Sequence, residues 1–201
     1  MKPSRAAHHV RTLAEACAAM AGRPATIFPL RVQELWVWGG ALEPGRDVER
    51  VGVALAVDLP AADVPWLGEP KGAQHWADAT RMSRTPFTPR WRSVHAPVWN
   101  HRVERPLLVW DAPGGPREDA LGALAEGAAQ ALRAPAPPPD ALRDRLERER
   151  AVSLAELAAA TAAYEERRWA PGKLEPHADR LARASAGYLD VLDGLAGLAL
   201  A

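Results

Sequence analysis

The chain has 201 residues, of which 48% are hydrophobic, so it can bury a core without the help of disulfides or structural metals. Its 25 basic and 25 acidic residues cancel, and any binding to nucleic acid or anionic lipid would therefore have to be local. The single cysteine, Cys17, excludes an internal disulfide and a multi-cysteine metal site. The sequence has neither the apolar core of a signal peptide nor an apolar run of about 18 residues, so we expect a cytoplasmic protein that does not span a membrane.

The basic residues are nearly all arginine, since lysine occurs only at Lys2, Lys71 and Lys173. Together with abundant alanine, glycine and proline, this bias predicts a bacterial source with a G+C-rich genome. It also weakens arginine content as an argument about function. Tryptophan is the unusual feature, because eight tryptophans stand beside two phenylalanines and two tyrosines.

The first part of the chain predicts one helix followed by buried strands. Apolar residues at helical spacing predict an amphipathic helix over 4–21, which buries Cys17 and stops at Gly22. A short apolar segment over 35–38 and a longer one over 51–57 predict two central strands. In the second strand large apolar side chains alternate with glycine and alanine, so one face leaves room for a helix or a ligand.

The middle of the chain is less regular. We expect a short helix over 73–82 and an extended or irregular segment over 83–105, which prolines interrupt. A third strand is predicted over 107–110, ended by Asp111, and a helix follows over about 117–133.

A proline-rich linker over 134–139 leads to the C-terminal helices. We expect Asp140 to cap the first of them. Opposite charges four residues apart predict that this helix has an exposed face; the pairs are Arg143/Glu147, Asp144/Arg148 and Arg145/Glu149. In the last helix an apolar stripe with Gly187 and Gly194 predicts close packing against the preceding helix or a second copy of the chain.

These elements predict an α/β (α+β) fold. A small mixed sheet with flanking helices is expected over 1–134, followed by a C-terminal helical hairpin over 140–201. The hairpin also offers a surface for a homodimer.

The segment Leu35-Trp-Val-Trp-Gly-Gly40 and the later strand Val51-Gly-Val-Ala-Leu-Ala-Val-Asp58 resemble the start of the polymerase-beta-type nucleotidyltransferase fold. In that family a strand leads to a Gly-Ser pair that holds phosphates, and the next strand carries an Asp-x-Asp pair that binds magnesium. A third carboxylate follows on a neighbouring strand, and a helical domain often comes after it. The strand ending at Asp111 and the C-terminal helices stand in a compatible order.

The residues that carry the chemistry of that family differ in this chain. Gly40 stands in place of the serine, and Arg50 and Gly52 align with the metal-binding pair. Glycine offers no ligand, and arginine places a positive charge where magnesium would bind. Asp58 cannot replace the pair, because six residues of strand at about 3.3 Å each place it roughly 20 Å away. The resemblance therefore implies a catalytically degenerate module that binds a nucleotide or a protein partner.

A nucleotide would bind such a module through backbone amides and positive charge, without a metal. The candidates are Gly39, Gly40 and Arg50. An active, magnesium-dependent nucleotidyltransferase is the first alternative, and it would keep the Gly-Gly pair as its phosphate loop. Its candidate metal ligands are Asp47, Glu49 and Asp111, with Glu104 as another source of the third carboxylate. Such a site needs carboxylates that converge within a few ångströms.

A nucleic-acid-binding accessory protein is the second alternative, because arginine and aromatic residues alternate over 81–105. The candidate contacts are Arg90, Trp91, Arg92, His95, Trp99, His101 and Arg102. In the competing interpretation the tryptophans cover the sheet, and the arginines stack on them or reach solvent.

Other common signatures are absent from the sequence. It has no Gly-x4-Gly-Lys-Ser/Thr loop, no Gly-x-Gly-x-x-Gly fingerprint and no Gly-x-Ser-x-Gly elbow. Its six histidines do not have metal-ligand spacing. We therefore expect no cofactor unless the magnesium-dependent alternative is correct.

Overall fold

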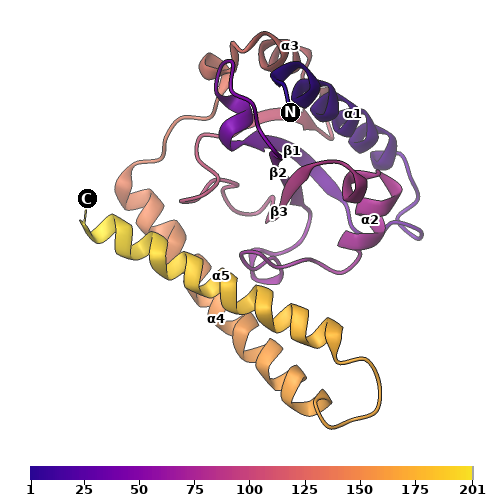
Figure 1. Ribbon diagram of the computed structural model, residues 1–201, viewed down its shortest axis with the longest axis vertical. Coiled ribbons are helices and arrows are strands. Elements are labelled where there is room, and N and C mark those ends of the chain that lie inside the picture. Colours follow the sequence, from indigo (N-terminus) through magenta and orange to yellow (C-terminus); the bar gives the residue numbers. More distant parts are fainter. Residues whose placement is uncertain (201) are drawn as a thin grey trace.

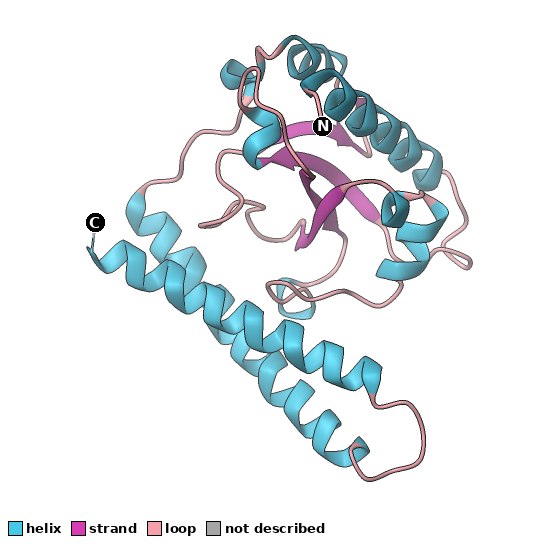
Figure 2. Ribbon diagram, viewed as in Figure 1, coloured by secondary structure: helices cyan, strands magenta, loops and turns pink. Residues whose placement is uncertain are grey.

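The computed structural model describes residues 1–200 and contains one open sheet with helices on both faces (Figures 1 and 2). The α-helices are α1 (Pro3–Ala21), α2 (Ala73–Ala79), α3 (Glu118–Glu126), α4 (Pro139–Arg167) and α5 (Glu175–Leu200). The strands are β1 (Val32–Trp38), β2 (Val51–Val57), β3 (Phe87–Ser93), β4 (Leu107–Asp111) and β5 (Gly115–Pro116). The sheet order is β3-β2-β1-β4-β5, in which β2 and β3 are parallel and the other pairs antiparallel. The expected fold, a mixed sheet followed by a helical hairpin, is confirmed.

β2 lies inside the sheet, as its sequence predicts. All seven of its residues are buried, and it pairs with β1 on one side and β3 on the other. Its valine and leucine side chains join the main core with residues of α1, α2 and α3. Cys17 of α1 belongs to this core, and burial raises the pKa of its thiol far above the ordinary range.

β3 occupies part of the segment that we expected to be extended or irregular. Pro89 lies within this strand, opposite Val53 of β2. Because β3 is at the edge of the sheet, one side of its backbone has no neighbouring strand, and a proline there removes no hydrogen bond from the ladder. The prolines therefore did not prevent a regular strand.

The helix ends differ from the predicted ones for local reasons. The helices expected over 73–82 and 117–133 are shorter, ending at Ala79 and Glu126. Gly127 ends the second of them by adopting a left-handed conformation with φ of 71°. Asp140 lies in the first turn of α4 rather than at its cap, where its charge favours the positive end of the helix dipole.

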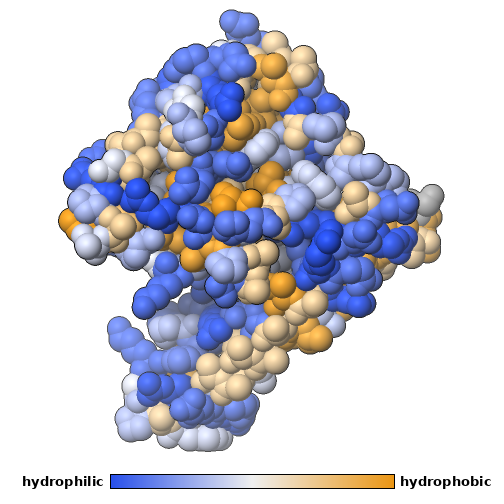
Figure 3. All heavy atoms as spheres, turned by 180° about the vertical axis from the view of Figure 1, so that it is seen from behind, coloured by the Kyte–Doolittle hydropathy of each residue, from blue (hydrophilic) through white to orange (hydrophobic). Residues whose placement is uncertain are grey.

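α4 and α5 form the predicted hairpin and cross the second face of the sheet. A separate core cluster joins Ala54 of β2 to Leu146 of α4 and Val191 of α5. The far ends of the two helices project beyond the body, and the surface is hollowed where they leave it (Figures 1 and 3). The division of the chain into parts 1–134 and 140–201 stays a prediction.

Two of the three α5 glycines, Gly187 and Gly194, lie at a contact that we did not expect. A Cβ at Gly187 would lie 2.2 Å from the backbone oxygen of Trp66, and one at Gly194 would lie 2.7 Å from the ring of His101. Both glycines therefore let α5 approach loops of the sheet-bearing part closely. Within residues 1–200, no helix is both long and apolar enough to cross a membrane.

Candidate functional site

The positions that we predicted to correspond to a nucleotidyltransferase phosphate loop and metal pair lie at one end of β1 and β2. Gly39 and Gly40 begin a 3-10 turn directly after β1. Gly52 is covered by Trp38, since a Cβ there would lie 2.7 Å from both the Trp38 ring and its backbone oxygen. Arg50 is engaged across the edge of the sheet, where it donates to the hydroxyl of Thr88 at 3.3 Å and to the backbone oxygen of Phe87.

The candidate carboxylates of the enzyme alternative are not brought together. Asp47 and Glu49 are exposed in the loop before β2. Asp111 pairs with Glu34 near the other end of β1, five residues of strand from Gly39, which is roughly 16 Å at about 3.3 Å each. Its two oxygens accept hydrogen bonds from the Gly114 amide at 2.7 Å and from Arg117 Nε at 2.6 Å.

The remaining carboxylate of that alternative, Glu104, is exposed in the loop before β4. No group of three or more His, Cys, Asp and Glu side chains in the described chain could hold a metal ion.

Arginines and tryptophans of the segment 81–105 largely cover the sheet, in agreement with the competing interpretation of their pattern. Arg90 lies between two indole rings, 5.8 Å from the centre of Trp38 and 5.5 Å from that of Trp66. Arg92 is buried beneath Trp66 at 5.2 Å. Trp91 faces the opposite way and packs edge-on against Trp76 of α2.

The other residues of this segment lie in the loop after β3. His95 is exposed and lies 3.0 Å from the carboxylate of Asp58. Trp99 is half-buried, whereas His101 and Arg102 both contact Asp190 of α5. The segment is therefore divided between a sheet face, a loop and the contact with the hairpin.

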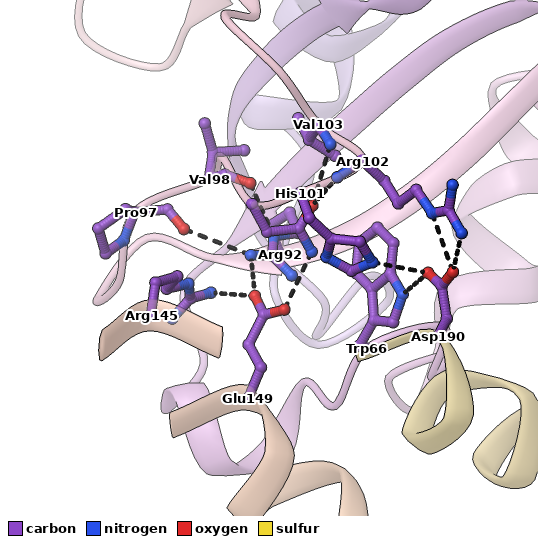
Figure 4. A network of polar contacts seen from close by, with 11 residues as sticks. Trp66, Arg92, Pro97, Val98, His101, Arg102, Val103, Arg145, Glu149 and Asp190 are labelled. Atoms are coloured by element: carbon purple, nitrogen blue, oxygen red, sulfur yellow. Dashed lines mark hydrogen bonds and ion pairs between the residues drawn. The ribbon is translucent and has the colours of Figure 1, made fainter. Parts of the chain in front are cut away.

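A buried ion cluster joins β3 to α4 (Figure 4). The carboxylate of Glu149 accepts hydrogen bonds from Arg92, from Arg145 at 2.9 Å and from the Asn100 amide at 2.9 Å. Arg92 also donates from Nε to the backbone oxygen of Val98 at 2.9 Å. The Arg92 and Glu149 side chains are only 1% and 6% exposed, so these contacts are shielded from water.

The charges in this cluster do not balance, since two guanidinium groups share one carboxylate. Burial alone would raise the pKa of Glu149, but the positive charges of Arg92 and Arg145 outweigh it and hold that pKa below its ordinary value. Burial and the charge of Arg92 together lower the pKa of Arg145 to about 10. The buried Nε of Arg145 also has no hydrogen-bond partner among residues 1–200.

A second polar contact joins α5 to the same region. Asp190 accepts a hydrogen bond from Trp66 Nε1 at 2.7 Å and from Arg102 Nε at 2.9 Å, and it lies 3.2 Å from His101 Nε2. Partial burial alone would raise the pKa of Asp190. The hydrogen bonds from Arg102 and Trp66 lower this pKa by more than burial raises it, so the pKa lies below its ordinary value. Trp66 therefore lies between the two clusters.

A cleft of about 530 Å³ opens beside the ion cluster, between α4 and the loops that follow β2 and β3. Its size is in the range of small-molecule sites. Its polar lining includes Arg145, Arg148, Glu149 and His95, and its apolar lining includes Trp66, Val64, Pro97 and Val152.

Sequence reasoning missed this cleft because it assigned the Arg145/Glu149 pair to an exposed helical face. That assignment is wrong: the pair is formed, at 2.9 Å, but both side chains are buried. The signal was the apolar residues on the same side of the helix, since Leu142 and Leu146 precede Glu149 at helical spacing. Glu147 pairs with Arg150 rather than with Arg143.

The fold and the cleft define an α+β protein in which a helical hairpin closes over one face of a mixed sheet. Residues 1–197 match the family described as a domain of unknown function (DUF7711), and the chain belongs to this family. No curated protein and no solved structure matches the chain.

Proposed function

We propose that this protein is a non-catalytic, nucleotidyltransferase-like module that binds a small molecule in the cleft between α4 and the loops after β2 and β3. The observation that carries the proposal is a cleft of about 530 Å³ whose lining combines the charged Arg145, Arg148 and Glu149 with the apolar Trp66 and Val152. Small-molecule sites are typically clefts of this size with an apolar wall and a few charged groups, so this lining supports a small-molecule ligand.

The proposal that catalysis is lost is supported by the residues at the end of β1. The ring of Trp38 fills the space above Gly52, and Arg50 is held by β3. Both positions align with the metal-binding pair of the nucleotidyltransferases, and neither offers an oxygen ligand to magnesium. The separation of Asp111 from Asp47 and Glu49 gives no support to the enzyme alternative.

Binding is tested with the full chain by calorimetry and thermal shift against ATP, AMP and adenosine. The variant Ala151→Trp places a large ring at an exposed position that lines the cleft, and it is expected to weaken binding at least tenfold. Ala162→Trp, at an exposed position further along α4 and outside the cleft lining, is the matched control. Binding that both variants leave unchanged would remove the cleft from the proposal.

Catalysis is tested separately with labelled nucleoside triphosphates and magnesium or manganese, measuring label on protein, RNA and small acceptors. We expect no turnover. Turnover that is lost in Asp47→Ala or Glu49→Ala would replace this proposal with the active enzyme. Binding of single-stranded RNA that depends on Arg102 and survives Ala151→Trp would favour the accessory-protein alternative.

A further inference from the structure

The wall of the cleft carries more positive than negative charge. Arg145 and Arg148 line it with only one carboxylate, that of Glu149, and this carboxylate is shared with Arg92, which is buried outside the lining. Arg148 stands one turn further along α4 at the rim of the cleft, and it forms no ion pair with residues 1–200. The expected Asp144/Arg148 pair is not among the ion pairs formed in this part of the chain.

The other ionisable groups at the cleft do not cancel this excess. His95 lies on the opposite wall, and Asp58, which it contacts at 3.0 Å, is not part of the cleft lining. Arg92, Arg145 and Glu149 therefore leave an excess of about one buried positive charge, and the exposed Arg148 adds a second at the rim, because each arginine remains protonated at neutral pH.

An excess of buried positive charge is costly unless an anion compensates it. Guanidinium groups bind tetrahedral and planar oxyanions through two parallel hydrogen bonds, and the side chains of Arg145 and Arg148 both line the cleft. A phosphate monoester carries a charge close to −2 at pH 7, which matches the excess better than a single carboxylate.

The cleft is larger than a phosphate group needs. Its remaining wall is apolar and aromatic, formed by Trp66, Val64, Pro97 and Val152. A ligand that fills it must therefore combine an anionic group with an uncharged body of modest size.

We propose that the cleft binds a small organic phosphate monoester, with its phosphate between Arg145 and Arg148 and its organic part against Trp66 and Val152. This inference rests on the proposed binding function and adds the class of ligand. It concerns a different place from the Gly39–Gly40 turn. That turn follows β1 beside the start of β2, whereas the cleft loops follow the far end of β2, seven residues or roughly 23 Å away at about 3.3 Å per residue.

The test is isothermal titration of the full chain at low ionic strength with three probes: inorganic phosphate, AMP and adenosine. Phosphate and AMP are expected to bind, AMP more tightly, and adenosine at least tenfold more weakly than AMP. Arg148→Gln is expected to weaken AMP binding about tenfold, the loss of one charge-assisted hydrogen bond. Because Arg148 is exposed, this variant should fold like the parent, which circular dichroism and the melting temperature verify.

Arg150→Gln is the matched control, since Arg150 is an exposed arginine of the same helix that lies outside the cleft and pairs with Glu147. It is expected to leave AMP binding unchanged. Arg145→Met, which keeps the length of the side chain without its charge, should abolish phosphate binding where it folds.

Each outcome decides between the two proposals. If AMP and adenosine bind equally and Ala151→Trp blocks both, the cleft is a binding site but its ligand is not a phosphate, and only this inference fails. If AMP binding survives Arg148→Gln and Ala151→Trp, the phosphate lies elsewhere and both proposals fail at this site. If neither phosphate nor AMP binds at about 10 mM, the phosphate inference is overturned.

Discussion

β2 presents valine and leucine side chains to α1, α2 and α3, but only glycine and alanine to α4 and α5. On the first face the core is aliphatic and aromatic throughout. On the second face, tryptophan, arginine and a single glutamate fill the space that the small β2 residues leave. One side of β2 thus packs into an apolar core, and the other side faces a more polar interior beneath the α4–α5 hairpin.

The two faces differ in what their buried groups contribute. Burial of apolar area favours folding without regard to direction, so the first face tolerates changes of shape better than changes of polarity. Buried ion pairs contribute little net stability but fix geometry, and removing one partner is costly. The cleft lies beside the second face, where that geometry is fixed.

The largest effect is expected on the apolar face. Val53→Asp places a carboxylate at a position with no exposure to solvent, in the centre of the main core. An unpaired buried charge costs several kcal/mol, which is enough to unfold many domains of this size. The loss is measured by urea denaturation, and a melting temperature equal to that of the parent would refute the assignment of β2 to the core.

The next effect probes the polar face. Glu149→Gln keeps the shape of the side chain but leaves Arg92 and Arg145 without their carboxylate. We expect a loss of about 3 kcal/mol in the free energy of unfolding, measured by urea denaturation. Replacing all three residues with methionine should recover most of this loss, because the charges that need pairing are then gone. A single Glu149→Gln variant as stable as the parent would show that the cluster is open to water.

Local pattern was enough to predict the apolar face. The alternation of large and small apolar residues predicted β2, and apolar residues at helical spacing predicted α1. Both patterns can be recognised within a short stretch of sequence, because each element packs one side against the core. Short stretches of sequence did not predict the regular strand around Pro89. A proline is tolerated there because β3 is an edge strand, and this depends on the order of strands in the sheet and not on the neighbours of Pro89 in sequence.

The polar face could not be predicted, because its contacts join residues far apart in the chain. Arg92 and Glu149 are 57 residues apart, and Trp66 and Asp190 are 124 apart. A charge pair four residues apart on a helix looks the same in sequence whether the helix face meets solvent or an arginine of the sheet.

A smaller effect sharpens the contact between α5 and the sheet-bearing part. Gly187→Ala would bring a Cβ to 2.2 Å from the backbone oxygen of Trp66, so α5 must shift, and we expect a loss of about 1–3 kcal/mol. Gly197→Ala is the control in the same helix, because its Cβ would meet nothing within 4 Å. It should stabilise the protein by about 0.5–1 kcal/mol through helix propensity. Equal effects of the two changes, measured by thermal denaturation, would mean that α5 does not pack closely here.

The smallest effect concerns acid stability at Asp190. Its carboxyl pKa lies below the ordinary value of 3.8, because the hydrogen bonds from Arg102 and Trp66 outweigh the effect of partial burial. A carboxyl with a lowered folded pKa stabilises the fold at pH values above its unfolded pKa, and this stabilisation is lost as the pH falls through the folded pKa. Asp190→Asn should therefore lower the melting temperature at pH 7 but change it little near pH 2.

Asp193→Asn, which removes an exposed carboxylate from the same helix, is the control and should leave the melting temperature at pH 7 nearly unchanged. A parent and an Asp190→Asn variant whose melting temperatures stay parallel from pH 7 to pH 2 would contradict the assignment. The contribution of the hydrogen bonds at Asp190 to stability would then not depend on its charge.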